Sequence, residues 1–237
     1  MIVLSIDSST ESATCAVLSD DKLLGEIILN DKKQHSVVLM PAVDNLLKNL
    51  NLTIKDIDAY VVSKGPGSFT GLRIGMSMVK GLSQGSGKPF VSISSLDALA
   101  NNMAYTNGII CPILDALRDN VYTALYSFEN GSLNRQSEYL PLHIDELINL
   151  LKEQNTPVTF IGDAVDKFKD KLMESFAAVQ FAPKHLNIVR ASSLGELGYE
   201  LLKNGVYDDI YTSSPIYLRK SQAEREYDKK IGLDKNE

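Results

Sequence analysis

Three short stretches at the start of the chain decide its fold: IVLSID (Ile2–Asp7), ATCAVLS (Ala13–Ser19) and LLGEIIL (residues 23–29). Each is rich in Val, Ile, Leu or Thr and is separated from the next by turn residues, a pattern typical of neighbouring strands. The pattern that follows predicts a helix over residues 36–50, a strand over 59–63, a helix over 70–84 and a strand over 90–95.

The same order of elements recurs in the second half. Strands are expected in IICPILD (109–115), NVYTALYSF (120–128) and RQSEYL (135–140), and Asn130-Gly131 is a strong hairpin signal. A helix, a strand, a helix and a strand follow, over 144–153, 158–163, 164–176 and 177–182. Strands joined by helical crossovers imply a mixed sheet covered by helices. The two copies predict an α/β protein with a duplicated actin-like (ribonuclease H-like, ASKHA) fold and two mixed-sheet subdomains.

These repeats set the expected domain boundaries. The N-terminal actin-like subdomain spans residues 1–102 and is joined by a returning C-terminal helix at 191–215. The degenerate C-terminal subdomain spans 103–190. Residues 220–237 form a tail of mixed charge with few apolar residues, which we expect to be mobile when alone.

Composition excludes several classes of protein. The chain has 237 residues and a net charge of -6, without the clustered Lys and Arg of a protein that grips nucleic acid by itself. Cys15 and Cys111 lie in apolar segments, as buried reduced thiols do. No apolar run is long enough for a membrane span, and the start of the chain does not read as a leader, so a cytoplasmic location is expected.

The glycine-rich stretch KGPGSFTGLRIG (residues 64–75) raises the question of a nucleotide site. It is not a Walker A loop, because no Lys-Ser/Thr pair follows its glycines. ATP-binding members of the fold need two hairpins with an Asp and glycines, so that backbone N–H groups reach the phosphates. Here Asp7-Ser8-Ser9-Thr10 and Asp115-Ala116-Leu117-Arg118 have the Asp without glycine. We expect Asp7 and Asp115 to cap turns, with Asp7, Ser9 and Thr10 the candidates for any residual nucleotide contact.

The two N-terminal helices carry more apolar surface than one sheet covers. In the second helix, for which Thr70 is the expected N-cap, two stripes are apolar: Leu72, Met76 and Val79, and Ile74, Gly75, Met78 and Leu82. The first helix has one apolar stripe, formed by Leu39, Val43, Leu46 and Leu50. Met40 and Leu47 extend this stripe, and Val37 and Val38 widen it at its start. The surplus favours a subunit interface. The alternative is that the second stripes pack on each other or on the second subdomain.

No catalytic constellation stands out. The three histidines, His35, His143 and His185, lack the spacing of two metal ligands on one helix face, and no cysteine pair suits a zinc site. A nucleophile elbow of the G-x-S-x-G type is also missing. The residues therefore give no support for proteolysis.

Five segments together resemble the TsaB (YeaZ) family: KGPGSFTGLRIG, IDSSTESATCAVL, HSVVLMPAVDNLL, SISSLDALA and PIYLRK. The resemblance implies a non-catalytic scaffold subunit of the complex that makes threonylcarbamoyladenosine in tRNA. Such a subunit binds and activates a TsaD-like catalytic subunit through its N-terminal-domain helices. A TsaE-like ATPase joins the pair, tRNA is reached through the complex, and the subunit forms homodimers through the same surface when alone.

The resemblance also implies what this chain has lost. The TsaD-like relatives carry a His-x-x-x-His metal pair where this chain has Ser95 and Leu99. Leu cannot bind a metal, so neither a metal nor a cofactor is expected. The glycine loop would then bring two helices together. The implied partner interface comprises His35, Val37, Met40, Leu47, Gly71, Leu72, Arg73, Gly75, Met78 and Leu82. Two alternatives stay open: an actin-like-fold ATP-binding enzyme acting on its own, and a stand-alone homodimer without a tRNA role.

Overall fold

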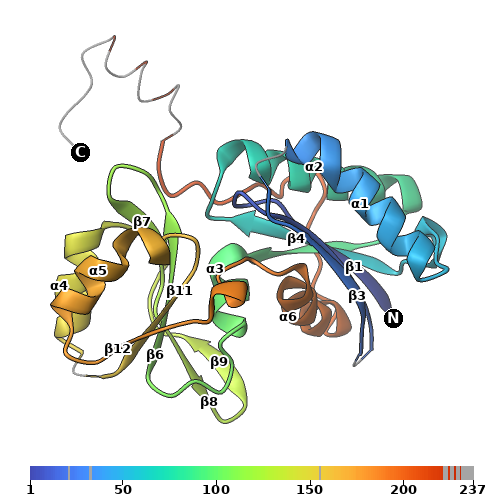
Figure 1. Cartoon of the computed structure of the whole chain (residues 1–237). Coiled ribbons are helices and arrows are strands. Elements are labelled where there is room, and N and C mark those ends of the chain that lie inside the picture. Colours follow the sequence, from blue (N-terminus) through green and yellow to red (C-terminus); the bar gives the residue numbers. More distant parts are fainter. Residues whose placement is uncertain are drawn as a thin grey trace.

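The computed structural model describes residues 1–20, 22–31, 34–154 and 156–220, together with residues 224, 227 and 230. Most of the charged tail at 220–237 therefore lies outside the described residues. The chain folds into two sheets that lie side by side, each flanked by helices (Figure 1). Within the described ranges, no helix is long and apolar enough to cross a membrane.

The first sheet has the order β3-β2-β1-β4-β5. Strands β1 (Ile2–Asp7), β2 (Ala13–Ser19) and β3 (Lys22–Leu29) are antiparallel, whereas β4 (Ala59–Gly65) and β5 (Phe90–Ser94) run parallel to β1. Helices α1 (His35–Asn49) and α2 (Phe69–Ser86) cover one face, and α3 (Ser95–Asn101) and α6 (Ala191–Lys203) lie on the other (Figure 1). Successive side chains of β1 alternate between these two layers, because Leu4 packs in the core with α1 and α2 and Val3 in the core with α6.

The second sheet repeats this plan with the order β10-β7-β6-β11-β12. Its elements are β6 (Ile109–Asp115), β7 (Asn120–Thr123), β8 (Tyr126–Glu129), β9 (Ser132–Arg135), β10 (Leu140–His143), α4 (Ile144–Lys152), β11 (Val158–Ile161), α5 (Val165–Ser175) and β12 (Val179–Phe181). Short 3-10 turns at Ile54–Asp56 and Lys184–Leu186 complete the regular elements. The duplicated actin-like fold with two mixed sheets is confirmed.

Two expected strands of the second copy were wrong. The stretch NVYTALYSF breaks into β7 and β8, because the Leu125 N–H donates to Ser137 Oγ at 2.9 Å and its C=O accepts the Gln136 N–H at 2.7 Å. This local pairing turns β8 away from β7 and into a hairpin with β9, closed by Asn130 and Gly131 at positive φ. Of the strand expected at 135–140, only Arg135 at the end of β9 and Leu140 at the start of β10 lie in strands, and residues 136–139 form an irregular connection.

Two helix ends also differ from expectation. The N-cap of α2 is Ser68, whose side chain accepts the Gly71 N–H, and Thr70 lies inside the helix. Helix α6 ends at Lys203 and does not continue to residue 215. The chain then runs as an irregular segment at residues 206–219, here called the C-terminal strap, which lies along β5 and α2.

Candidate functional site

The glycine loop between β4 and α2 packs against the turn between β1 and β2 of the same chain. The Ser68 N–H donates to the Ser9 C=O at 2.7 Å, and Ser8 Oγ donates to the Gly71 C=O at 2.8 Å. An added Cβ would lie 1.9 Å from the Ser8 carbonyl oxygen at Gly71 and 2.2 Å from the Ser9 carbonyl oxygen at Gly67. The expectation that these glycines let two helices approach was therefore wrong, since they let the helix start meet a hairpin within the monomer.

The start of the β1–β2 turn, from Asp7 to Ser9, is buried. Asp7 is fully buried, and its Oδ1 accepts the Ser9 N–H at 3.1 Å, as the turn-cap expectation requires. Burial raises the pKa of Asp7 to about 6, and the hydrogen bond from the Ser9 N–H offsets only part of this effect. Asp7 Oδ2 and Ser9 Oγ are buried without a hydrogen-bond partner among the described residues. Half-buried Thr10 contacts Ser12 Oγ through its hydroxyl at 2.9 Å.

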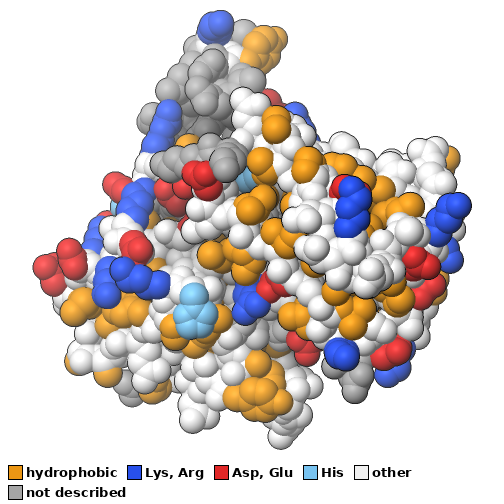
Figure 2. Space-filling model, turned by 45° about the vertical axis from the view of Figure 1, so that its right-hand side comes forward, with side chains coloured by type: hydrophobic (Ala, Val, Ile, Leu, Met, Phe, Trp, Pro, Cys, Tyr) orange, Lys and Arg blue, Asp and Glu red, His pale blue; other side chains and the backbone are white. Residues whose placement is uncertain are grey.

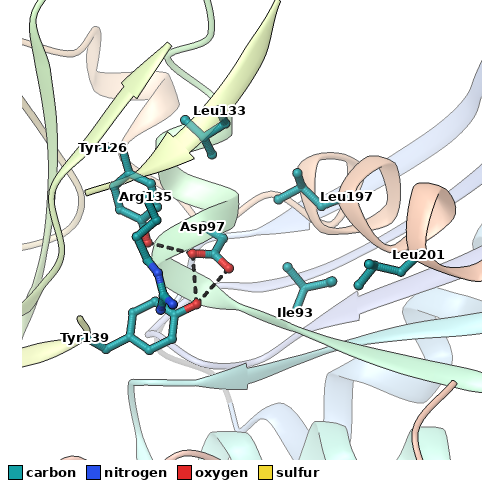
Figure 3. Close-up of a pocket in the computed structure, with 8 residues that line it drawn as sticks. All are labelled: Ile93, Asp97, Tyr126, Leu133, Arg135, Tyr139, Leu197 and Leu201. Atoms are coloured by element: carbon teal, nitrogen blue, oxygen red, sulfur yellow. Dashed lines mark hydrogen bonds between the residues drawn. The ribbon is translucent and has the colours of Figure 1, made fainter. Parts of the chain in front are cut away.

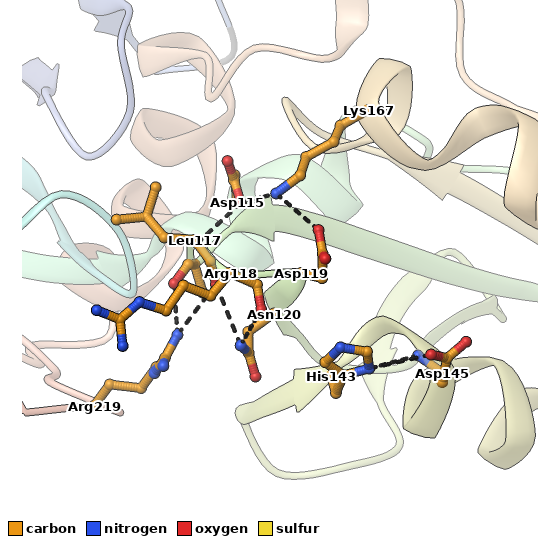
Figure 4. A network of polar contacts seen from close by, with 10 residues as sticks. Asp115, Leu117, Arg118, Asp119, Asn120, His143, Asp145, Lys167 and Arg219 are labelled. Atoms are coloured by element: carbon orange, nitrogen blue, oxygen red, sulfur yellow. Dashed lines mark hydrogen bonds and ion pairs between the residues drawn. The ribbon is translucent and has the colours of Figure 1, made fainter. Parts of the chain in front are cut away.

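The equivalent turn between β6 and β7 is held by side chains in place of glycines (Figure 4). Asp115 Oδ1 accepts the Leu117 N–H at 3.0 Å, so the expected capping role of Asp115 is confirmed. Lys167 Nζ lies 3.2 Å from Asp115 Oδ1 and 3.6 Å from Asp119 Oδ1. Arg219 from the C-terminal strap donates to the Ala116 C=O at 2.6 Å. Leu117 and its two successors lie at positive φ, and the Leu117 N–H, which could otherwise reach a phosphate, already donates to Asp115.

Ser95 and Leu99, where the family resemblance implies a metal pair in TsaD-like relatives, are both buried in this chain. Ser95 Oγ donates to the Pro66 C=O at 2.5 Å, and Leu99 is a core residue of the α3–α6 layer. Among the residues that the structure describes, no group of three His, Cys, Asp or Glu side chains could hold a metal ion. The side chains present at this place thus make structural contacts.

The outer surface of α1 and α2 carries several apolar side chains that are partly or fully exposed. It comprises six partly or fully exposed side chains, here called the α1–α2 face: Val37, Val38, Met40, Ile74, Met78 and Leu82. Val37 is 63% and Met40 45% exposed. Figure 2 shows hydrophobic side chains gathered over the half of the view that contains these helices, with charged ones mostly around its edge. Gly81 and Gly85 lie on α2 with nothing within 4 Å of an added Cβ.

Four residues expected at a partner interface are buried within the monomer. Leu47 packs in the core under α1, and Leu72 is 1% exposed beneath the glycine loop. Gly71 and Gly75 face Ser8, whose carbonyl and hydroxyl fill the space a partner would need. The prediction that these four residues contact a partner was therefore wrong. Of the remaining ones, Val37, Met40 and Arg73 are exposed, and His35, Met78 and Leu82 are half-buried.

The C-terminal strap covers one flank of α2, which the sequence patterns did not reveal. Tyr217 stacks on Phe69 with ring centroids 4.7 Å apart, and Arg73 Nε donates to the Tyr217 hydroxyl at 3.0 Å. Lys80 Nζ donates to the Ser213 C=O at 2.6 Å. The segment PIYLRK contributed to the family resemblance, but nothing in its residue spacing predicts that it packs against α2. Arg73 is thus held by its own chain at the edge of the α1–α2 face.

Comparisons with known proteins show the family of this chain. The model of the TsaD family, described as tRNA N6-adenosine threonylcarbamoyltransferase, matches residues 22–227. The tRNA threonylcarbamoyladenosine biosynthesis protein TsaB of Bacillus subtilis is 36% identical over 230 residues, which cover 96% of this chain and 98% of that protein. The TsaB of Escherichia coli is 25% identical and covers 94% of this chain and 96% of its own length.

Solved structures show the same fold. YeaZ from Pseudomonas aeruginosa superposes with a TM-score of 0.77 at 22% identity, covering 92% of this chain and 99% of that one. A second structure from that organism, described as an uncharacterized protein with similarity to peptidase YeaZ, gives the same values. This likeness concerns the fold alone, whereas the family follows from the sequence matches. The chain belongs to the TsaB (YeaZ) family of tRNA threonylcarbamoyladenosine biosynthesis proteins.

Proposed function

We propose that this chain is a non-catalytic scaffold subunit of the tRNA adenosine threonylcarbamoyltransferase complex, which binds and activates a TsaD-like catalytic subunit. The observation that carries the proposal is the α1–α2 face, where α1 exposes Val37 and Met40 beside four partly exposed apolar side chains, Val38 on α1 and three on α2. Contiguous apolar surface of this kind marks interaction sites. The same face serves a homodimer when the chain is alone, a TsaE-like ATPase joins the heterodimer, and tRNA is reached through the complex.

The state of the two actin-like hairpins supports a role without chemistry of its own. The β1–β2 turn is packed against the glycine loop, and the β6–β7 turn is tied down by Lys167 and Arg219. Ser95 and Leu99 use their side chains for packing within the chain. A subunit built in this way contributes surface to a partner that carries the reacting groups.

Binding of a TsaD-like protein from the same organism tests the proposal. Met40→Glu and Met78→Glu each place a charge in the α1–α2 face, and a charge buried in an interface without a partner weakens binding by about 2 kcal/mol or more, roughly thirtyfold. Met173→Glu in α5 is the matched control, because Met173 is 55% exposed and lies in the other subdomain. Isothermal calorimetry gives the affinities. Equal affinities for the three variants and the wild-type chain would remove the α1–α2 face as the interface.

An ATP-binding enzyme acting on its own is the second candidate, and the unsatisfied Asp7 Oδ2 and Ser9 Oγ favour it. A buried polar atom without a hydrogen bond is explained by a bound ligand, by a water molecule or by local strain. Calorimetry of the isolated chain at millimolar ATP separates the two readings. Binding that disappears in Asp7→Ala would favour the enzyme, and absence of binding would exclude it.

A stand-alone homodimer with no tRNA role predicts a different phenotype. Deletion of the gene would then leave the amount of threonylcarbamoyladenosine in tRNA unchanged by mass spectrometry. Loss of the modified nucleoside would instead agree with the scaffold proposal.

A further inference from the structure

A pocket of about 290 Å³ lies where the two sheets meet, away from the α1–α2 face (Figure 3). The first half of the chain supplies Ile93 from β5 and Asp97 from α3, and helix α6 supplies Leu197 and Leu201. The β8–β9 hairpin and the segment after it supply the other wall, with Tyr126, Leu133, Arg135 and Tyr139. Any ligand held here would touch both subdomains at once.

One polar end of the pocket is a carboxylate fixed in place by two phenols. The Tyr126 hydroxyl donates to Asp97 Oδ1 at 2.7 Å, and the Tyr139 hydroxyl donates to Asp97 Oδ2 at 2.8 Å. Asp97 lies in the first turn of α3 and is half-buried. Because a carboxylate has about four acceptor sites, Asp97 still has capacity for an additional donor.

The second polar end is the Arg135 guanidinium. It lies 4.1 Å from the centroid of the Tyr139 ring, so the guanidinium rests on an aromatic face (Figure 3). In the part of the chain that the structure describes, this guanidinium makes no hydrogen bond or ion pair. Stacking fixes the plane of an arginine and leaves its N–H donors available for a planar anion such as a carboxylate.

The rest of the lining is aliphatic. Ile93, Leu197 and Leu201 lie together on the side of the pocket away from Arg135, whereas Leu133 comes from β9, the same strand as Arg135 (Figure 3). Ligand sites combine such apolar walls with a few fixed polar groups that orient the ligand. Here the polar groups carry opposite charges and do not pair with each other.

We propose that this pocket binds a small zwitterion with an apolar side chain, that is, a free aliphatic α-amino acid. Asp97 accepts hydrogen bonds from the ammonium group, Arg135 donates to the carboxylate, and the aliphatic wall covers the side chain. A ligand with only a carboxylate would place a second negative charge beside Asp97 without a compensating cation. A ligand with only an amine would place a second positive charge beside Arg135. The zwitterion satisfies both groups.

The test uses the full chain and three matched small molecules. L-Leucine is titrated into the protein while amide and methyl resonances of the lining residues are followed by NMR. Leucinamide lacks the carboxylate charge, and 4-methylpentanoate lacks the amine. The expected result is binding of leucine in the micromolar to millimolar range, with each analogue about tenfold weaker or more, since each loses a charge-assisted hydrogen bond. Unchanged lining resonances at millimolar leucine, or equal binding of all three, would overturn the proposal.

Two variants assign the polar ends separately. Arg135→Gln should remove the preference for leucine over leucinamide, and Arg118→Gln is its control because Arg118 is an exposed arginine on the β6–β7 turn. Asp97→Asn keeps a carbonyl acceptor for the tyrosines and should remove the preference for leucine over 4-methylpentanoate. Unaltered preferences in variants whose thermal midpoints match the wild-type chain would refute the assignment.

Discussion

The substitution Gly71→Ala tests the close contact on which the first subdomain is built. Its Cβ would sit 1.9 Å from the Ser8 carbonyl oxygen, a backbone atom that must retreat by roughly 1 Å before the contact becomes tolerable. That retreat strains two hydrogen bonds, from Ser8 Oγ to Gly71 and from Ser68 to Ser9, each worth about 1 kcal/mol. Overpacking adds about 1–3 kcal/mol, and the better helix propensity of Ala returns about 1 kcal/mol.

The expected net loss is about 2–4 kcal/mol of unfolding free energy, measured by urea titration, or a fall in Tm of roughly 5–15 °C. Gly81→Ala in the same helix is the control, because nothing lies within 4 Å of its added Cβ. It should stabilise the monomer by about 0.5–1 kcal/mol. If Gly71→Ala unfolds within about 0.5 kcal/mol of the wild-type chain, the contact between the glycine loop and the β1–β2 turn is not a tight one.

Three more predictions concern the same subdomain. Ser68→Ala removes the N-cap of α2 and should lower the unfolding free energy by about 1 kcal/mol, whereas Thr70→Ala should change it little; the reverse order would restore Thr70 as the cap. Because burial raises the pKa of Asp7 to about 6, the native state favours the protonated acid, and stability falls as the pH rises from about 4 through 6. Asp7→Asn should abolish this fall and be more stable than the wild-type chain by about 2–3 kcal/mol at pH 7, and an unchanged pH profile of unfolding would contradict the buried site. Tyr217→Ala removes the aromatic stack on α2 and should speed amide hydrogen exchange in residues 206–219 severalfold, while an unaltered exchange rate would show that other contacts hold the strap.

Much of the fold was predictable because its signals are local. The apolar runs that form β1 and β6, the helical periodicity over α1 and α2 and the Asn130-Gly131 turn each lie within a few neighbouring residues. Their repetition in the same order indicated a duplicated mixed sheet. The absence of glycine from both hairpins likewise pointed to Asp7 and Asp115 as turn caps, and the hydrogen bonds agree.

The candidate site was less predictable, because periodicity shows which residues are apolar but not what covers them. Gly71 and Ser8 are 63 positions apart in the chain, so their contact has no local signal. The same holds for the C-terminal strap, in which Tyr217 reaches Arg73 across 144 positions. Four of the ten residues assigned to a partner interface are therefore buried within the monomer.

The sequence by itself determined the order of strands and helices, the duplication and the family, since each follows from patterns along the chain. Only the tertiary structure decided that the glycines serve a contact inside the monomer, that the strap covers a flank of α2 and that Asp97 and Arg135 share a pocket. The physical reason is that burial and pairing arise from segments that meet in space. The sequence determines which side chains are present, and the tertiary packing decides which of them remain exposed to bind a ligand or a partner.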